Sequence, residues 1–156
     1  MNNPRINTLV KTLQDPDADR RSQATEELWQ IWFEQKGAAG LQSLQRAQIL
    51  LQAGEANQAE ALLTQLIHDL PDFAEAWNRR AVLHFTRGQY RQAIADCKAT
   101  IDLNPVHFGA LHGMGLAYAS LGEYSEAIYF FRQALEIQPY SIENQRLILE
   151  CSARLS

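Results

Sequence analysis

Six side chains in this sequence could take part in catalysis or metal binding: His68, His84, His107, His112, Cys97 and Cys151. Two zinc ligands on one helix must share a face, but His107 and His112 are five residues apart and do not. No HExxH pattern, cysteine cluster or carboxylate partner at a fixed spacing accompanies them. We therefore expect no catalytic residue, no metal and no cofactor, and we predict that the protein is not an enzyme.

The two cysteines are far apart and fit neither a disulfide framework nor a metal-binding pattern. Cys97 falls among apolar positions of a predicted helix, where a free cysteine behaves as a small hydrophobic residue. Such cysteine usage favours a reducing compartment, and we expect a cytoplasmic protein.

The segment HFGALHGMG contains three glycines within seven residues: Gly109, Gly113 and Gly115. A phosphate-binding loop would need a preceding strand and a following GK[ST], and the sequence has neither. Glycine costs about 1 kcal/mol relative to alanine inside a helix, so Gly109 and Gly113 call for an explanation. Either they allow a ligand chain to approach the backbone closely, or a well-packed helix pair tolerates them.

The overall composition describes an ordinary globular protein. The 156 residues are 46% hydrophobic and 21% charged, with a net charge of −4. An acidic balance argues against a nucleic-acid partner, which usually requires a basic surface. The first residues, MNNPRINTLVKTLQ, lack the apolar stretch of a secretory signal, and no run approaches the roughly 18 apolar residues of a membrane span. We expect a soluble protein without a membrane span.

Stepping through the sequence at a fixed interval reveals a repeat of 34 residues. Three columns carry it: Gly54, Gly88, Gly122; Ala59, Ala93, Ala127; and Pro71, Pro105, Pro139. Glycine ends a helix in the left-handed conformation, alanine permits close helix contact, and proline stops the second helix. Between these residues the apolar spacing is helical, and each unit is therefore a predicted helix pair.

A 34-residue period with these Trp, Gly, Tyr, Ala and Pro positions resembles the tetratricopeptide repeat family. The second copy has Trp77, Ala81, Gly88 and Tyr90, and the third has Gly115, Tyr118, Tyr124 and Phe131. The resemblance implies an all-α fold, an α-solenoid of antiparallel helix pairs, with copies at 40–71, 74–105 and 108–139. The second copy departs from the pattern at Arg80, His84, Cys97 and Thr100.

The pieces IWFEQKG, WNRRA and HFGALHGMG together resemble small bacterial repeat proteins of this kind. Residues 1–37 are predicted to form a helical hairpin that packs on the first copy as a cap. Its second helix, starting at Asp15-Pro16, carries the aromatics Trp29, Trp32 and Phe33, which are either buried at that junction or form a docking patch. Residues 141–156 are predicted to form a C-terminal capping helix, with Ser141 as N-cap and Ile148, Leu149 and Leu155 facing the third copy.

In this family the first helices of successive repeats line a concave groove that binds peptides. Register and neighbouring positions give these candidate groove residues: Leu44, Gln48, Leu51, Asn78, Arg79, Val82, Phe85, Gly109, His112, Gly113, Leu116 and Ser120. Chaperone-binding members grip a peptide carboxylate with Lys and Asn at the fifth and ninth positions of the first repeat. Here these positions are Leu44 and Gln48, so the carboxylate clamp is absent.

The resemblance therefore implies a scaffold or adaptor that binds a largely apolar or neutral protein segment and assists assembly of a larger complex. The same side chains could instead pack on the hairpin or on each other. A self-associating module is a second possibility, since Tyr129 and Phe130 fall on the outer side of a second helix, where they pack on the C-terminal cap or form a homodimer contact. An RNA-binding helical repeat is a third, which the low positive charge of the groove disfavours.

Overall fold

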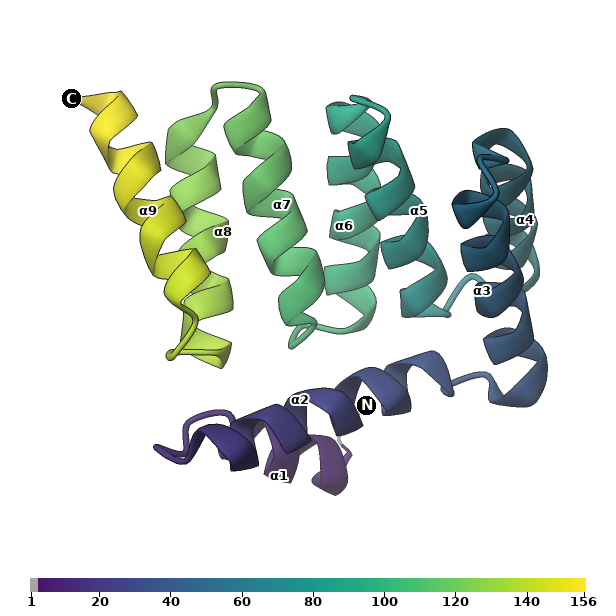
Figure 1. Ribbon diagram of the computed structural model, residues 1–156, viewed down its shortest axis with the longest axis horizontal. Helices are drawn as coiled ribbons and strands as arrows, with labels where there is room; N and C mark the ends of the chain where they lie inside the picture. The colour runs from purple at the N-terminus through teal and green to yellow at the C-terminus, as the bar shows by residue number, and fades with distance from the viewer. Residues whose placement is uncertain (1–2) are drawn as a thin grey trace.

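The computed structural model describes residues 3–156, and within them the chain forms nine α-helices and no strand. The helices are α1 (Pro4–Thr12), α2 (Ala18–Phe33), α3 (Gly37–Gln52), α4 (Ala56–Asp69), α5 (Ala74–Thr86), α6 (Tyr90–Leu103), α7 (Phe108–Ser120), α8 (Tyr124–Ile137) and α9 (Ile142–Leu155). Helices α3 to α8 form three antiparallel pairs that stand side by side, as Figure 1 shows. The predicted α-solenoid of three helix pairs is confirmed.

The repeated glycines end the first helix of each pair as predicted. Gly54, Gly88 and Gly122 have φ values of 80°, 73° and 77°, a conformation that is cheap only for glycine. After α3, Gly54 N–H donates to the Leu51 carbonyl and Glu55 N–H donates to the Leu50 carbonyl. This pairing satisfies carbonyls that the helix end would otherwise leave without donors.

Small residues bring the two helices of each pair into close contact. Ala59, Ala93 and Ala127 are each at most 1% exposed. In the third pair a Cβ at Gly115 would lie 2.5 Å from Cε1 of Phe131, so only glycine fits against that ring. The repeat columns therefore reflect helix packing.

Helix α9 continues the register of the repeats. Helices α5, α7 and α9 begin at residues 74, 108 and 142, so α9 occupies the place of the first helix of a further pair. Ser141 Oγ accepts a hydrogen bond from Asn144 N–H at 3.2 Å, as expected of an N-cap. Ile148 packs on the third repeat, but Leu149 is 71% exposed, and Leu155 is also exposed, contrary to the prediction that all three face it.

The aromatic pair of α8 does not pack on the C-terminal cap, which is one of the two arrangements predicted for it. The Phe130 ring stacks on Tyr118 with centroids 5.7 Å apart, and it lies against a cluster that includes Cys97 of the second repeat. Tyr129 is exposed. Neither side chain belongs to the cluster that α9 forms with the third repeat, because Phe130 points back along the solenoid.

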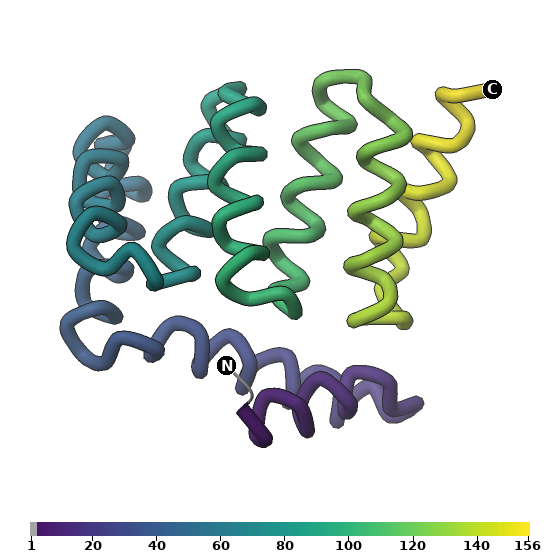
Figure 2. The backbone as a smooth tube through the Cα atoms, turned by 180° about the vertical axis from the view of Figure 1, so that it is seen from behind, coloured from purple at the N-terminus to yellow at the C-terminus, as the bar shows by residue number. Residues whose placement is uncertain are grey.

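The N-terminal hairpin lies across the ends of the repeat helices, as Figures 1 and 2 show from opposite sides. Helix α2 begins two residues later than predicted, because the side chain of Asp17 rather than Asp15 accepts from the first N–H groups. Gln14 Nε2 donates to the carbonyls of Glu136 and Ile137 at 3.1 and 3.2 Å. The hairpin thus reaches the third repeat in addition to the first, where Phe33 of α2 packs against the core.

None of the helices in the described residues combines the length and the apolar character needed to cross a membrane.

Candidate functional site

Aromatic side chains of α2 pack against the start of α7. The Trp32 ring stacks on His107 with centroids 4.5 Å apart, and Trp29 meets Phe108 edge to face at 5.4 Å. A Cβ at Gly109 would lie 2.7 Å from Cη2 of Trp29. The chain that approaches this glycine closely is therefore the protein's own second helix.

A buried carboxylate links this aromatic cluster to the second repeat. Glu75 is completely buried, and its oxygens lie 2.9 Å from His107 Nε2 and 3.0 Å from Asn78 Nδ2. Because His107 Nδ1 accepts the Ala110 N–H at 3.0 Å, Nε2 carries the ring proton and donates it to Glu75. Arg79 Nε lies 3.5 Å from Glu75 Oε1, so the buried charge has an ionic partner as well as two hydrogen-bond donors.

A pocket of about 580 Å³ lies between α2 and the face formed by α3, α5 and α7, which we call the groove face. We call this cavity the α2 pocket; its lining residues are Glu26, Trp29, Gln30, Phe33, Glu34, Leu41, Asn78, Arg79 and Val82. Val82 is 50% exposed within it. The Arg79 guanidinium lies over the Phe33 ring, 4.8 Å from its centroid.

In the first repeat, only part of the predicted groove is accessible. Leu44 is 5% exposed and belongs to the core of that repeat, so its place as a groove-lining residue is corrected. Leu51 is half-buried against the same core, and Gln48 is exposed. Leu44 is buried because it belongs to the same apolar cluster as Leu63 and Ile67 of α4.

In the second and third repeats, several predicted groove residues contact other parts of the chain. Asn78 is buried on Glu75, and Gly109 lies beneath Trp29. His112 Nδ1 lies 2.7 Å from Asn144 Oδ1 of α9. A Cβ at Gly113 would face Cys97 Sγ of α6 at 3.4 Å. Gly109 thus follows the alternative in which groove positions pack on the hairpin, whereas His112 contacts α9 and Gly113 faces α6.

The remaining predicted residues lie along the groove face. Phe85 is half-buried, with its ring 5.4 Å from that of Tyr90. Leu116 and Ser120 border a second pocket of about 480 Å³ between α7 and α9. The structure thus brings Asn78, Arg79 and Val82 together in the α2 pocket and separates them from the third-repeat residues.

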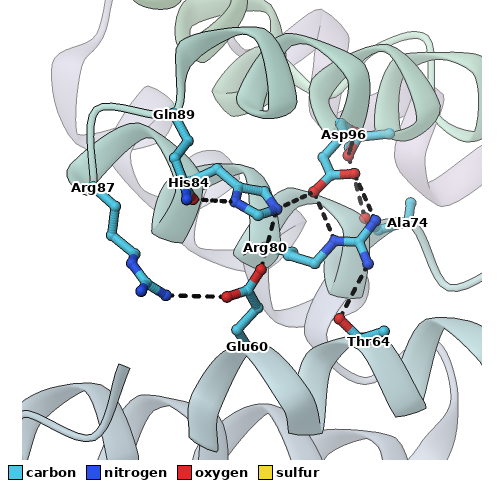
Figure 3. Close-up of polar contacts among 9 residues, drawn as sticks. Glu60, Thr64, Ala74, Arg80, His84, Arg87, Gln89 and Asp96 are labelled. Carbon is cyan, nitrogen blue, oxygen red and sulfur yellow. Dashed lines mark hydrogen bonds and ion pairs between the residues drawn. The ribbon is translucent and has the colours of Figure 1, made fainter. Parts of the chain in front are cut away.

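The repeat departures at Arg80, His84 and Thr100 form one polar network with Asp96, shown in Figure 3. The Arg80 guanidinium donates to both Asp96 oxygens, at 2.7 and 2.8 Å, and to Thr64 Oγ1 of α4 at 3.2 Å. The hydrogen bond to Asp96 raises the pKa of Arg80. The network joins α4 of the first repeat to α5 and α6 of the second. At the position of Asp96 the other two copies carry Leu62 and Phe130.

Cys97 lies in the core column of the second repeat and is 3% exposed. Burial raises the pKa of its thiol from 9.0 to about 12, which keeps it protonated and unreactive at neutral pH. Among the described residues, no three His, Cys, Asp or Glu side chains are arranged to hold a metal ion.

The sequence left Trp29 and Phe33 either buried at the hairpin junction or part of a docking patch, and it did not predict Glu26 and Glu34 as site residues. Gly109 was the available signal for the contact between α2 and α7. It lies inside a predicted helix but outside the repeated glycine positions, which indicated that another segment approaches the backbone there. The rings are largely buried at the junction, and part of Trp29 and Phe33 still faces the pocket.

The tandem antiparallel helix pairs form an α-solenoid, and its groove face carries a pocket. A family model described as tetratricopeptide repeat matches residues 72–139. A TPR repeat-containing protein of Rhizobium etli is 30% identical over 136 residues, which cover 86% of this chain and 67% of that protein. The chain belongs to the tetratricopeptide repeat family, whose domains are in general interaction modules rather than enzymes.

Other relatives match only a small part of their own length. The human Superkiller complex protein 3 is 39% identical over 67 residues, which are 43% of this chain and 4% of that protein. Among solved structures, the first TPR of Spaghetti (RPAP3) bound to the HSP90 peptide SRMEEVD has a TM-score of 0.71 at 22% identity, covering 74% of this chain and 91% of that one. The structure of MamA covers 97% of this chain and 80% of its own, with a TM-score of 0.68 at 21% identity. At these identities the two structures show the shared fold.

Proposed function

We propose that this protein is a non-enzymatic adaptor that binds a segment of a protein partner on its groove face and assists assembly of a larger complex. The observation that carries the proposal is the apolar surface left open on that face, where Val82 is 50% exposed beside Trp29, Phe33 and Leu41. An exposed apolar patch in a preformed hollow is typical of a peptide-binding site. The solved RPAP3 domain, which has the same fold, holds a peptide.

The expected ligand is largely apolar or neutral, for two reasons. The lining of the α2 pocket is mainly apolar, and the carboxylate-gripping pair of chaperone-binding relatives is replaced by Leu44 and Gln48. Gln48 is exposed but uncharged, and Leu44 is buried. A peptide that depends on its terminal carboxylate would thus lack its main electrostatic partner.

The test is affinity capture from cells that produce the protein, comparing the parent with the double variant Val82→Glu/Phe85→Glu. A partner that binds the groove face is lost from the variant while circular dichroism shows intact helix content. The single variants Val82→Glu and Tyr129→Glu are compared as a matched pair, since Tyr129→Glu places the same single charge on an exposed residue of α8. If the double variant captures the same proteins as the parent, groove binding is wrong.

Self-association is a second candidate, favoured by the outer face of α9. Ile142 is 78% exposed and Leu149 is 71% exposed, seven residues apart and so on one side of the helix. Sedimentation of the parent and of Ile142→Glu/Leu149→Glu tests it. A monomer at high concentration in both samples removes this function.

A further inference from the structure

The α2 pocket has a preformed aromatic wall. Trp29 and Phe33 stack with centroids 5.6 Å apart and planes inclined by 26°. Trp29 is supported from behind by edge contacts to Trp32 and Phe108 at 5.4 Å each. A wall held on several sides needs little reordering when a ligand binds, which favours affinity.

The single basic side chain among the pocket-lining residues is already neutralised. Arg79 pairs with the buried Glu75 at 3.5 Å, and its guanidinium lies over the Phe33 ring. The Glu75 charge is in turn held by Asn78 and His107. The positive charge in the α2 pocket is therefore balanced from within the protein.

Two carboxylates on the rim of the α2 pocket have no positively charged partner in the described part of the chain. Glu26 and Glu34 line the pocket from α2, and both are exposed. Glu34 accepts a hydrogen bond from Gln30 at 3.3 Å, and neither carboxylate forms an ion pair within the described residues. The rim thus carries uncompensated negative charge around an apolar floor, and complementary charge on a partner would be positive.

We propose that the α2 pocket binds a protein segment in which an aliphatic or aromatic side chain is flanked by lysine or arginine. This inference rests on the proposed function: it keeps the apolar side chain expected there and replaces the expected neutral flank with a positively charged one. The apolar side chain lies against Trp29, Phe33 and Val82, and the basic side chain reaches Glu26 or Glu34. Such a ligand is opposite in charge to the acidic end of the HSP90 peptide in the RPAP3 structure.

The experiment is selection of random 12-residue peptides displayed on phage against the immobilised full chain. The expected consensus is an apolar residue with lysine or arginine nearby. Selected peptides are then synthesised and their dissociation constants measured at low and high salt. The charge-reversal variant Glu26→Lys/Glu34→Lys should weaken binding about tenfold at low salt, and less at high salt.

The matched control is Glu126→Lys/Glu136→Lys on α8. It changes the net charge equally on exposed side chains away from the α2 pocket, and should leave the affinity unchanged. All four positions are exposed, so circular dichroism should show the same helix content in each variant.

The outcomes separate the two proposals. If the selected peptides are acidic or uncharged, the basic partner is overturned and the groove function stands. The same holds if basic peptides bind the parent and the Glu26→Lys/Glu34→Lys variant with equal affinity. Failure to select any peptide that is sensitive to Val82→Glu/Phe85→Glu overturns the groove function itself. Self-association of the parent that Val82→Glu abolishes identifies a second copy as the occupant and also overturns the basic partner.

Discussion

The indole of Trp32 lies almost parallel to the imidazole of His107, with centroids 4.5 Å apart and planes inclined by 19°. Trp32 is on α2, and His107 caps α7 through its Nδ1 while its Nε2 donates to Glu75. One stacking contact therefore joins the hairpin, the third repeat and the second repeat. It also fixes the position of the helix that forms a wall of the α2 pocket.

Replacing Trp32 with alanine should release the hairpin. Loss of a buried tryptophan costs about 3–5 kcal/mol, and here the loss falls on the docking of α2. We expect a lower free energy of unfolding in urea and faster trypsin cleavage at Arg20, Arg21 and Lys36. Trp77→Ala is the control, since Trp77 packs on the first-repeat core and should lower stability without exposing those sites. Unchanged cleavage in Trp32→Ala would contradict this role.

Replacing each of two glycines of α7 with alanine should change the stability of the protein in opposite directions. At Gly109 the new Cβ would lie 2.7 Å from Trp29 Cη2, so the indole must move and stability should fall by about 1–3 kcal/mol. At Gly113 the nearest atom is Cys97 Sγ at 3.4 Å, an ordinary contact, so the gain in helix propensity should raise stability by about 0.5–1 kcal/mol. Equal effects on the urea midpoint in the two variants would refute the assignment of Trp29 to Gly109.

The network around Asp96 should be sensitive to the loss of a single partner. Asp96→Ala leaves the Arg80 guanidinium, whose side chain is 19% exposed, without its anion, and we expect a loss of about 3 kcal/mol. The double variant Arg80→Leu/Asp96→Ala removes both charges and places leucine where the repeat pattern has it. Its urea midpoint should recover most of the loss, and a double variant no more stable than Asp96→Ala would argue against the pair.

Cys97 should be inert in the folded protein. In Cys151→Ser at pH 8, a thiol reagent should react with Cys97 far more slowly than in concentrated guanidinium chloride. Between pH 9.0 and about 12 the unfolded thiol has lost its proton and the folded one still holds it. Stability should therefore fall as pH rises through this window, by at most about 1.4 kcal/mol per pH unit.

The difference in unfolding free energy between Cys97→Ala and its parent isolates this contribution from the titration of tyrosines and lysines. If that difference does not change between pH 9 and 11, the pKa of Cys97 is not raised.

The repeats could be predicted from the sequence because their determinants are local. A glycine at φ near 77°, an alanine at a helix contact and a proline two residues past a helix end each act within one pair, and they recur every 34 residues. The helical spacing of apolar residues likewise predicted which side of α2 is buried, and Leu28 and Trp32 on that side are both buried.

The sequence by itself determined the helix pairs and their order. Only the tertiary structure decided that the N-terminal hairpin contacts Gly109 and Ile137, and that Trp29 and Phe33 form one wall of a pocket on the groove face. It also decided that Arg80, which pairs with Asp96 inside the second repeat, reaches Thr64 of the first repeat. The physical reason is that hydrophobic periodicity indicates which face of a helix is buried but not which segment covers it. For the hairpin, the covering segments lie about 80 to 120 residues away in the sequence.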